Sequence, residues 1–321
     1  MADFKTFADK IKNSGQYSGN ILFDESMKRR TTFRIGGKTP VLFEPSDSAS
    51  VVYLLKNCKE SGIRTFILGG GSNIVFCDDP FDGVVISTAS LSGTRICTPT
   101  EIPESAETGD IFVRCGAGTP MAQFVSFCTE NDLWGTEEFA GLPGSAGGAL
   151  FMNARCFERS ISDIFVSAEY IDLDTFEKKY IDANKYDWDY KISPFQDGKK
   201  FVLSAIFRLK KHSSEEHSVL VQKNRDFIQE RKVKGHFKYP SAGSVFRNDR
   251  TIGKPSGKLI DECGLKSTRI GQAQIAPFHG NFIINLGGAT QKDVKTLVEF
   301  VVNRVREKTG FTLQTEIIFV E

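Results

Sequence analysis

Apolar residues recur with helical spacing in several segments of the chain. In residues 46–62 they occupy positions i, i+3, i+4 and i+7 from Val51, after a Ser/Asp cap and before Gly62. This pattern predicts an amphipathic helix that ends at a C-terminal glycine. Further helices are expected at 120–131, 212–234 and 290–310. The last of these opens on a capping box formed by Thr290 and Asp293.

Short apolar runs predict strands between and after these helices. They lie at 64–68, 74–76, 84–86, 111–115 and 311–320. Residues 165–210 are expected to be mostly strand, with a polar loop at 182–200, and residues 240–290 to hold loops and short strands. The fold class predicted from this order is α+β, with antiparallel or mixed sheets.

Composition narrows the class of protein. The chain has 321 residues, of which 40% are hydrophobic and 25% charged, which is typical of a soluble globular protein with about two domains. Forty-one Lys and Arg against 40 Asp and Glu give a net charge of +1. This balance predicts neither a nucleic-acid partner nor a membrane partner.

Cysteine and histidine spacing argues against metal sites and disulfides. The seven cysteines are scattered, the closest pair being 13 residues apart, and the four histidines form no HxxxH or HExxH pattern. The first residues lack the apolar core of a signal peptide, and no stretch approaches the ~20 apolar residues of a membrane span. We therefore expect a cytoplasmic, metal-free protein with reduced thiols.

Three glycine-rich segments stand out in a chain with 29 glycines: Gly69–Asn73, Gly116–Gly118 and Gly141–Gly148. Two of them follow an expected strand directly, which leaves several backbone N–H groups unobstructed by any Cβ. Such loops suit a diphosphate, although neither the Walker A lysine nor the GxGxxG spacing is present. Each alone fits a tight turn, but three within 80 residues favour a pyrophosphate cofactor.

A series of motifs extends from these loops toward both ends of the chain. They are Thr31–Gly37, Leu68–Asn73, Gly141–Ala149 with Met152–Ala154, Ser241–Asn248, Gly257–Lys266, His279–Asn285 and Glu316. In this order and spacing the chain resembles the UDP-N-acetylenolpyruvoylglucosamine reductase (MurB) family. The glycine loops alone would indicate only the wider group of FAD proteins with this binding domain, whereas Ala242–Asn248 and the C-terminal glutamate are much more specific.

The resemblance implies a three-domain FAD-binding flavoprotein of the PCMH/VAO type with a MurB-like C-terminal substrate domain. The expected domains are residues 1–90 with 311–321, residues 91–230, and a UDP-sugar domain at 231–310. The implied activity is the NADPH-dependent, FAD-mediated reduction of UDP-N-acetylglucosamine enolpyruvate to UDP-N-acetylmuramate in peptidoglycan synthesis. Ser244 follows Lys191 by only 53 positions, which indicates the shorter form of the family.

FAD is expected to be held without a covalent bond, because no histidine lies near the glycine loops in sequence. The resemblance assigns the cofactor to one arginine and to the glycine-rich loops. These residues are Arg34, Gly69, Gly70, Gly71, Ser72, Asn73, Gly116, Gly118, Gly141, Ser145, Gly147 and Gly148. NADPH is the implied co-substrate.

Two residues correspond to the family's proton donor and catalytic carboxylate. Hydride added to the terminal carbon of the substrate alkene places negative charge on the adjacent carboxylate. The site therefore needs hydrogen-bond donors at that carboxylate and a proton for the neighbouring carbon. By resemblance, Ser244 supplies this proton and Glu316 assists at the intermediate. Taken alone, Ser244 also fits a turn cap, and Glu316 a buried carboxylate that has a partner.

The chain departs from the family at a third position. The usual Tyr-Arg-x-Ser motif stands here as Tyr-Lys-Ile-Ser from Tyr190 to Ser193. Lys191 keeps the positive charge that stabilises the intermediate's carboxylate but lacks the planar, bidentate guanidinium. Either the site is a compensated variant or a second cation, for which Arg155 is a candidate, shares the role. We assign the role to Lys191 and expect Tyr190 to bind substrate.

The near-neutral net charge of the whole chain conceals a cationic segment. Residues 231–258 hold eight Lys or Arg and one acid, which is +7 in 28 residues. Such runs are often only solvated surface, but this one flanks Ser244 on both sides and favours a surface for a sugar diphosphate. Lys234 corresponds to the family's phosphate-contacting lysine. The other residues expected to bind substrate are Asn248, Gln274 and Asn281.

Two alternatives remain open at this stage. One is another oxidase of the same FAD fold, which leaves Ala242–Asn248 and Glu316 without a role. The other is a non-catalytic flavin- or UDP-sugar-binding regulatory paralogue, for which the lysine at position 191 is the one supporting feature. We expect a monomeric, cytoplasmic enzyme.

Overall fold

The computed structural model describes residues 3–101, 106–183 and 188–321. Within these ranges the apolar patterns of the sequence form regular helices and strands. The loop expected at 182–200 therefore lies in part, at 184–187, outside the described residues. The chain divides into two units. The first comprises Met1–Phe23, Val41–Gly70 and Gly83–Gln229, and the second Asp24–Pro40, Gly71–Asp82 and Glu230–Glu321.

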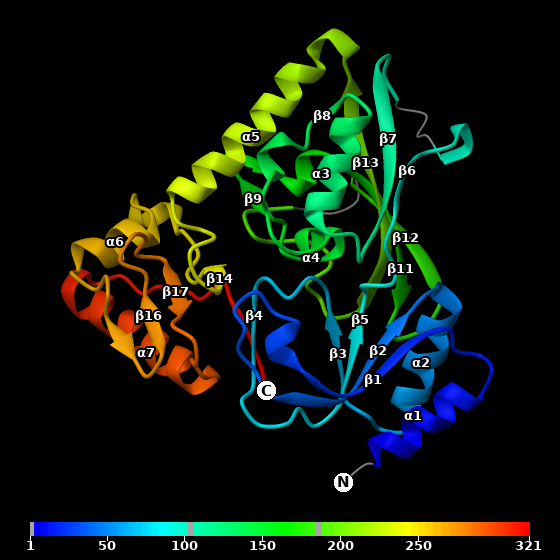
Figure 1. Cartoon of the computed structure of the whole chain (residues 1–321), viewed down its shortest axis with the longest axis horizontal. Coiled ribbons are helices and arrows are strands. Elements are labelled where there is room, and N and C mark those ends of the chain that lie inside the picture. Colours follow the sequence, from blue (N-terminus) through cyan, green and yellow to red (C-terminus); the bar gives the residue numbers. More distant parts are fainter. Residues whose placement is uncertain (1–2, 102–105, 184–187) are drawn as a thin grey trace. The chain divides into compact units, whose positions relative to one another are not determined.

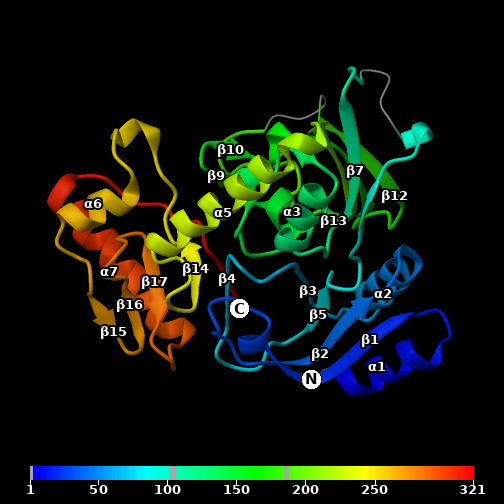
Figure 2. The same cartoon turned by 45° about the horizontal axis from the view of Figure 1, so that its top comes forward.

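The first unit is built on two sheets. The smaller has the order β1-β2-β5-β3, in which β2 and β3 both run parallel to β5 (Figure 1). Its elements are α1 (Phe4–Asn13), β1 (Gly19–Ser26), β2 (Lys38–Pro45), α2 (Ser48–Glu60), β3 (Thr65–Leu68) and β5 (Val84–Ser87). Helices α1 and α2 lie beside this sheet in both views (Figures 1 and 2).

The larger sheet is antiparallel, in the order β12-β11-β13-β7-β6, with β8 also paired to β13. Its strands are β6 (Thr94–Ile96), β7 (Asp110–Gly116), β8 (Leu133–Trp134), β11 (Phe165–Asp172), β12 (Lys178–Asp182) and β13 (Lys200–Lys211). The same unit holds α3 (Met121–Glu130), α4 (Ala146–Phe151), the hairpin of β9 (Arg155–Cys156) and β10 (Arg159–Ser160), and most of α5 (His217–Val233).

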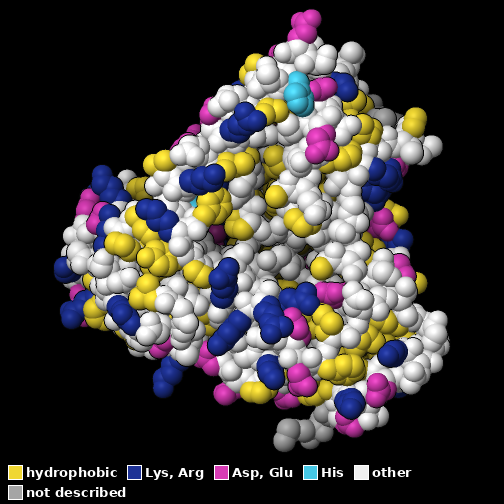
Figure 3. Space-filling view, viewed as in Figure 1, with side chains coloured by type: hydrophobic (Ala, Val, Ile, Leu, Met, Phe, Trp, Pro, Cys, Tyr) yellow, Lys and Arg dark blue, Asp and Glu magenta, His cyan; other side chains and the backbone are white. Residues whose placement is uncertain are grey.

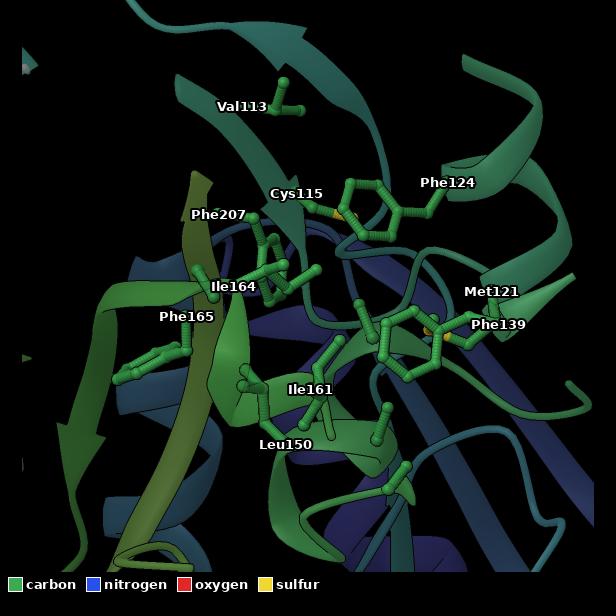
Figure 4. Packing of buried hydrophobic residues seen from close by; sticks show 14 of the residues in the cluster. Val113, Cys115, Met121, Phe124, Phe139, Leu150, Ile161, Ile164, Phe165 and Phe207 are labelled. Atoms are coloured by element: carbon green, nitrogen blue, oxygen red, sulfur yellow. The ribbon is translucent and has the colours of Figure 1, made fainter. Parts of the chain in front are cut away.

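One apolar core joins the larger sheet to α3 and α4. Phe124 of α3 packs on Phe207 of β13 with 4.9 Å between ring centroids, and Leu150 of α4 is fully buried in the same cluster (Figure 4). Burying a side chain of this size contributes about 1.5–3 kcal/mol relative to leaving it exposed. The packing holds α4 against β7 and β13.

The second unit contains a four-stranded antiparallel sheet, ordered β14-β17-β16-β15, and the parallel pair β18-β4. Its elements are β4 (Ile74–Phe76), β14 (Ser241–Ser244), α6 (Ser256–Glu262), β15 (Arg269–Ile270), β16 (Ala273–Ile275), β17 (Phe282–Asn285), α7 (Gln291–Thr309) and β18 (Ile318–Val320). Helices α6 and α7 lie against the sheet in both views (Figures 1 and 2). The apolar stripe of α7 is buried in the core of this unit.

The expected class, α+β with mixed sheets, is confirmed. So are the expected helices, including the capping box at Thr290, whose side chain accepts a hydrogen bond from the Asp293 N–H. The strand expected at 311–320 is wrong over most of its length, because β18 begins only at Ile318. Residues 314–316 instead bond irregularly to the backbone after β14. Elements α1, β1, β2 and α6 have no counterpart in the prediction.

Charges of both signs are interspersed over the face seen in Figure 3. This agrees with the near-neutral total charge. In the described part of the chain, no helix is both long enough and apolar enough to cross a membrane.

Candidate active site

Parts of three glycine-rich loops pack together in the first unit: Gly69 and Gly70 of the first loop, the loop after β7 and residues 141–148. The Gly70 N–H donates to Ser145 Oγ over 3.1 Å, and a Cβ on Gly70 would lie 2.5 Å from Gly144 Cα. The same Ser145 oxygen accepts from Gly148 N at 3.4 Å and so caps α4. Only glycine fits at position 70, because the backbone of the neighbouring loop occupies the space of a side chain.

The loop after β7 packs just as closely, against the segment that follows β5 and against the third glycine loop. A Cβ on Gly118 would lie 1.8 Å from Thr88 O, and one on Gly147 would lie 2.9 Å from Ala117 Cβ. The Gly147 N–H donates to Ala117 O over 2.9 Å. Gly141 makes a left-handed turn with φ 75° before the third loop. The structure thus gathers the expected cofactor glycines of the first unit into one cradle without side chains.

Not every amide of these glycines is available to an anion. Those of Gly70 and Gly147 are used in packing the loops together. In the second unit, by contrast, the N–H groups of buried Gly71 and of Ser72 have no acceptor among the described residues. Buried backbone donors are normally paired, so the Gly71 amide indicates a missing acceptor such as a diphosphate oxygen, and the half-buried Ser72 amide beside it is available to the same group.

Arg34 lies on a loop that the rest of the second unit holds firmly. Thr32 donates its N–H to Gly71 O (3.0 Å) and its Oγ1 hydroxyl to Ser241 O (2.8 Å). The buried Asn285 amide donates to Phe33 O at 3.1 Å. Arg34 itself is exposed, and its backbone adopts a left-handed conformation with φ 56°. Strain of this kind at a non-glycine residue is typical of functional positions.

Tyr190 and Lys191 occupy the two central positions of a tight turn in the first unit. Ile192 N donates to Asp189 O over 3.0 Å, and Lys191 has φ 60°, a conformation that favours glycine or asparagine. The Gln196 amide donates to Lys191 O at 3.0 Å, and the Asn153 amide to Asp189 O at 2.8 Å. The turn that presents Lys191 is therefore held by side chains from two neighbouring segments.

Arg155 lies in the same unit, on β9. Its guanidinium donates to Ser160 Oγ over 3.3 Å across the β9-β10 hairpin. This bond gives Arg155 a local structural role.

Ser244 and Glu316 lie on two backbone segments that run side by side in the second unit. Glu316 N donates to Val245 O at 2.7 Å, and Arg247 N donates to Gln314 O at 2.9 Å. Ser244 is half-buried, whereas Glu316 is only 9% exposed. The Asn73 amide donates to Glu316 O at 3.1 Å. Residues 73, 244 and 316, far apart in sequence, are thus brought together.

The expected substrate-binding residues differ in how their side chains are used. Lys234 is exposed at the end of α5 and forms an ion pair with Glu230. Asn248 Oδ1 accepts from Ser256 N (2.9 Å), and the Gln274 amide donates to Ser267 O (3.0 Å). Asn281 is 4% exposed, and its amide is bonded to the backbone of Phe246.

Two histidines of the second unit, His236 and His279, have lowered pKa values. Burial, reinforced by the positive charge of Arg231, lowers the pKa of His236 to about 4. Burial also lowers the pKa of His279, whose ring packs on Phe282 at 4.4 Å between centroids. Both rings are therefore neutral near pH 7, and His279 Nδ1 accepts a hydrogen bond from Asn281 N at 3.1 Å.

Sequence reasoning assigned no individual role to Asn285 or Gln196, and it treated Arg247 only as one cation of the segment 231–258. Asn285 and Gln196 hold the loops of Arg34 and Lys191. Arg247 has a buried Nε with no hydrogen-bond partner among the described residues. For Asn285 the motif His279–Asn285 was a usable signal, since it contains two amides beside buried strand residues. Gln196 stands in no such motif.

Comparisons with known proteins agree with this geometry. Residues 235–320 match the family model described as UDP-N-acetylenolpyruvoylglucosamine reductase, C-terminal domain, and residues 39–175 match an FAD binding domain. The UDP-N-acetylenolpyruvoylglucosamine reductase of Treponema denticola is 44% identical over 312 residues, with 94% of each chain covered. The chain belongs to the UDP-N-acetylenolpyruvoylglucosamine reductase family.

Other members of the family support this assignment. The reductase of Borreliella burgdorferi is 38% identical over 300 residues and covers 92% of this chain and 93% of its own. The crystal structure of the reductase (MurB) from Thermus caldophilus matches with a TM-score of 0.73 and 26% identity, covering 95% of this chain and 100% of that one. The FAD-domain match includes all three glycine loops, and their cradle fits a diphosphate-containing cofactor.

Proposed function

We propose that the protein reduces the enolpyruvyl ether of UDP-N-acetylglucosamine to UDP-N-acetylmuramate, with FAD as cofactor and NADPH as reductant. The observation that carries the proposal is the direct backbone link between the Ser244 and Glu316 segments, Glu316 N to Val245 O at 2.7 Å, in a member of the reductase family. The link joins the backbone of the nearly buried Glu316 to the residue that follows Ser244, at the end of β14.

The glycine cradle of the first unit, the amides of Gly71 and Ser72, and Arg34 are the groups that would hold FAD. The chemistry that FAD supplies when bound is the transfer of a hydride from NADPH to the substrate alkene. The residues of this chain then have to complete the reduction: the alkene gains one hydride and one proton, and the ether oxygen stays attached. In this scheme Ser244 Oγ–H delivers the proton to the carbon that bears the ether oxygen.

Charge has to be stabilised while the proton is delivered. Negative charge accumulates on the substrate carboxylate, and Lys191 supplies the opposing positive charge. Glu316 assists at the intermediate from its nearly buried position. Lys234 and its cationic neighbours bind the diphosphate, with Tyr190, Asn248 and Gln274 as further substrate contacts.

An anaerobic two-step experiment tests the function. The purified yellow protein is first bleached with one equivalent of NADPH, and UDP-N-acetylglucosamine enolpyruvate is then added. Return of the oxidised flavin spectrum, with formation of UDP-N-acetylmuramate, is the expected result. Flavin that stays reduced would leave an oxidase or a regulatory paralogue as the better description.

We further infer a monomeric cytoplasmic enzyme with the three domains that the resemblance implies. Light scattering at micromolar concentration measures the oligomeric state, and a dimer would contradict this inference.

A further inference from the structure

The amide of Asn281 lies at the junction of the two backbone segments that carry Ser244 and Glu316. It is 4% exposed and forms a reciprocal pair with one residue: Phe246 N donates to Asn281 Oδ1 at 2.8 Å, and Asn281 Nδ2 donates to Phe246 O at 2.8 Å. The backbone adds a third bond, from Val245 N to Asn281 O at 2.9 Å. Asn281 therefore binds both residues that follow Ser244.

We propose that Asn281 is a positioning residue for the Ser244–Glu316 pair, in place of the substrate contact that the sequence suggests. The inference rests on the proposed function, since it assigns Asn281 a role in proton delivery by Ser244. The amide is buried and committed to the main chain, so it acts through the segments that it holds.

The sheet itself explains why a side chain is needed here. Strand β14 pairs with β17 at Ser241 and again at Ser244, but the register shifts between these two positions. Regular ladder bonds end at Ser244, and the next two residues turn toward the segment of Glu316. The side chain of Asn281 supplies the donor and the acceptor that a continued strand would have offered to Phe246.

The same bonds fix Glu316 relative to Ser244. Val245 donates its N–H to Asn281 O and accepts the Glu316 N–H on its own carbonyl. Phe246 bridges to Thr315, and its ring is buried in the core. A shift of Val245 and Phe246 would move the hydroxyl and the carboxylate apart, and misplacement by about 1 Å costs on the order of 10²-fold in rate.

Measuring flavin reduction and flavin reoxidation separately distinguishes a positioning role of Asn281 from a general loss of native structure. In Asn281→Ala we expect flavin reoxidation by the enolpyruvyl substrate to slow on the order of 10²-fold. Flavin reduction by NADPH should stay within about twofold of the wild type, because Ser244 takes no part in it. Asn57→Ala is the matched control: it removes another buried amide, bonded to Tyr53 O at 2.9 Å, and should change neither half-reaction.

Asn281→Asp adds a signature that a merely structural role would not produce. An ionised carboxylate repels Phe246 O, whereas the protonated acid has the donor and acceptor of the original amide. Burial raises the pKa of such a carboxyl, so the reoxidation rate of the variant should rise relative to wild type as the pH is lowered. The wild-type series at the same pH values accounts for the other ionisable groups beside this segment, among them His279.

Hydrogen exchange supplies a readout independent of turnover. In Asn281→Ala the amides of Val245 and Phe246 should exchange faster, while those of β16 keep their protection. If the wild-type flavin is not reoxidised by the substrate, the proposed function fails. If wild-type reoxidation is normal and Asn281→Ala slows both half-reactions equally or neither, the positioning role is overturned. Unchanged exchange at Val245 and Phe246 would overturn it too.

Discussion

At the scale of single residues, the most informative positions are those whose backbone conformation or burial costs free energy. Arg34, Asn153 and Lys191 all adopt positive φ although none is a glycine. Each such conformation costs roughly 1–2 kcal/mol. All three stand in or beside the motifs that carry the family resemblance. Strain in these places is compatible with side chains being held in one direction for binding or catalysis.

Lys191 and Arg155 can be distinguished by parallel substitution. We expect Lys191→Ala to slow flavin reoxidation by substrate on the order of 10²–10³-fold, as for the loss of one charge-stabilising donor. Arg155→Ala should have little effect on that rate, because its guanidinium is bonded to Ser160 within a hairpin. Stopped-flow absorbance of the flavin measures both. Intact turnover in Lys191→Ala together with its loss in Arg155→Ala would reverse the assignment.

His236 predicts a dependence of stability on pH. Its folded pKa is about 4, below the ordinary value of 6.5, because burial disfavours the charged ring. Between these two values the unfolded chain binds more protons than the folded one, so this contribution to stability falls as the pH drops from 6.5 toward 4. Urea unfolding at pH 7 and pH 5 measures the loss.

The matching variant is His236→Gln, which cannot titrate. It should lose less stability between pH 7 and pH 5 than the wild type, because the protonation difference is gone. Equal losses in both proteins would show that other groups dominate this pH range.

At the scale of elements, strand ends and helix starts build the cofactor cradle. Strand β3 leads into Gly69 and Gly70, β7 into Gly116–Gly118, and Ser145 caps α4 while bonding to Gly70. Each loop alone is an ordinary turn. Together they remove side chains from one region of the first unit, which is what close approach of a diphosphate requires.

Gly70→Ala tests the cradle directly. The added Cβ would lie 2.5 Å from the backbone of Gly144, which is too close for either loop to stay in place. We expect less bound flavin per mole of protein, measured by the absorbance ratio of flavin to protein. Gly288→Ala is the control, since its Cβ would meet only Gln272 Cγ, at 3.7 Å. Wild-type flavin content in Gly70→Ala would contradict the role of the cradle.

At the scale of the whole molecule, the cofactor should contribute to stability. If FAD binds only the folded protein, it stabilises by RT ln(1 + [L]/Kd), which is about 2.7 kcal/mol at a free concentration of 100 Kd. The midpoint temperature of thermal unfolding of the flavin-depleted protein should therefore rise when FAD is added. FMN, which lacks the diphosphate, serves as the control and should raise it less. Equal effects of both would argue against a diphosphate site at the glycine loops.

The sequence alone determined the elements with strong local signals. The apolar periodicity of α2, α3 and α7, and the capping box at Thr290, depend on residues within one or two helical turns. It also determined the family, because Leu68–Asn73, Gly141–Ala149 and Ala242–Asn248 are contiguous motifs. What it could not determine was the length of the last strand, since pairing at residues 314–316 depends on a segment some 70 positions earlier.

Only the tertiary structure decided how the site residues act. The glycines of three loops become a cradle through contacts between distant residues, such as the bond from Gly70 N to Ser145 Oγ, 75 positions apart. Asn281, a polar residue in a family motif, is buried and bonded to Phe246 just beyond Ser244, where the pairing of β14 with β17 ends. Residue type and spacing indicate which chemistry is possible. Contacts between distant segments decide which side chain faces a ligand and which one holds another in place.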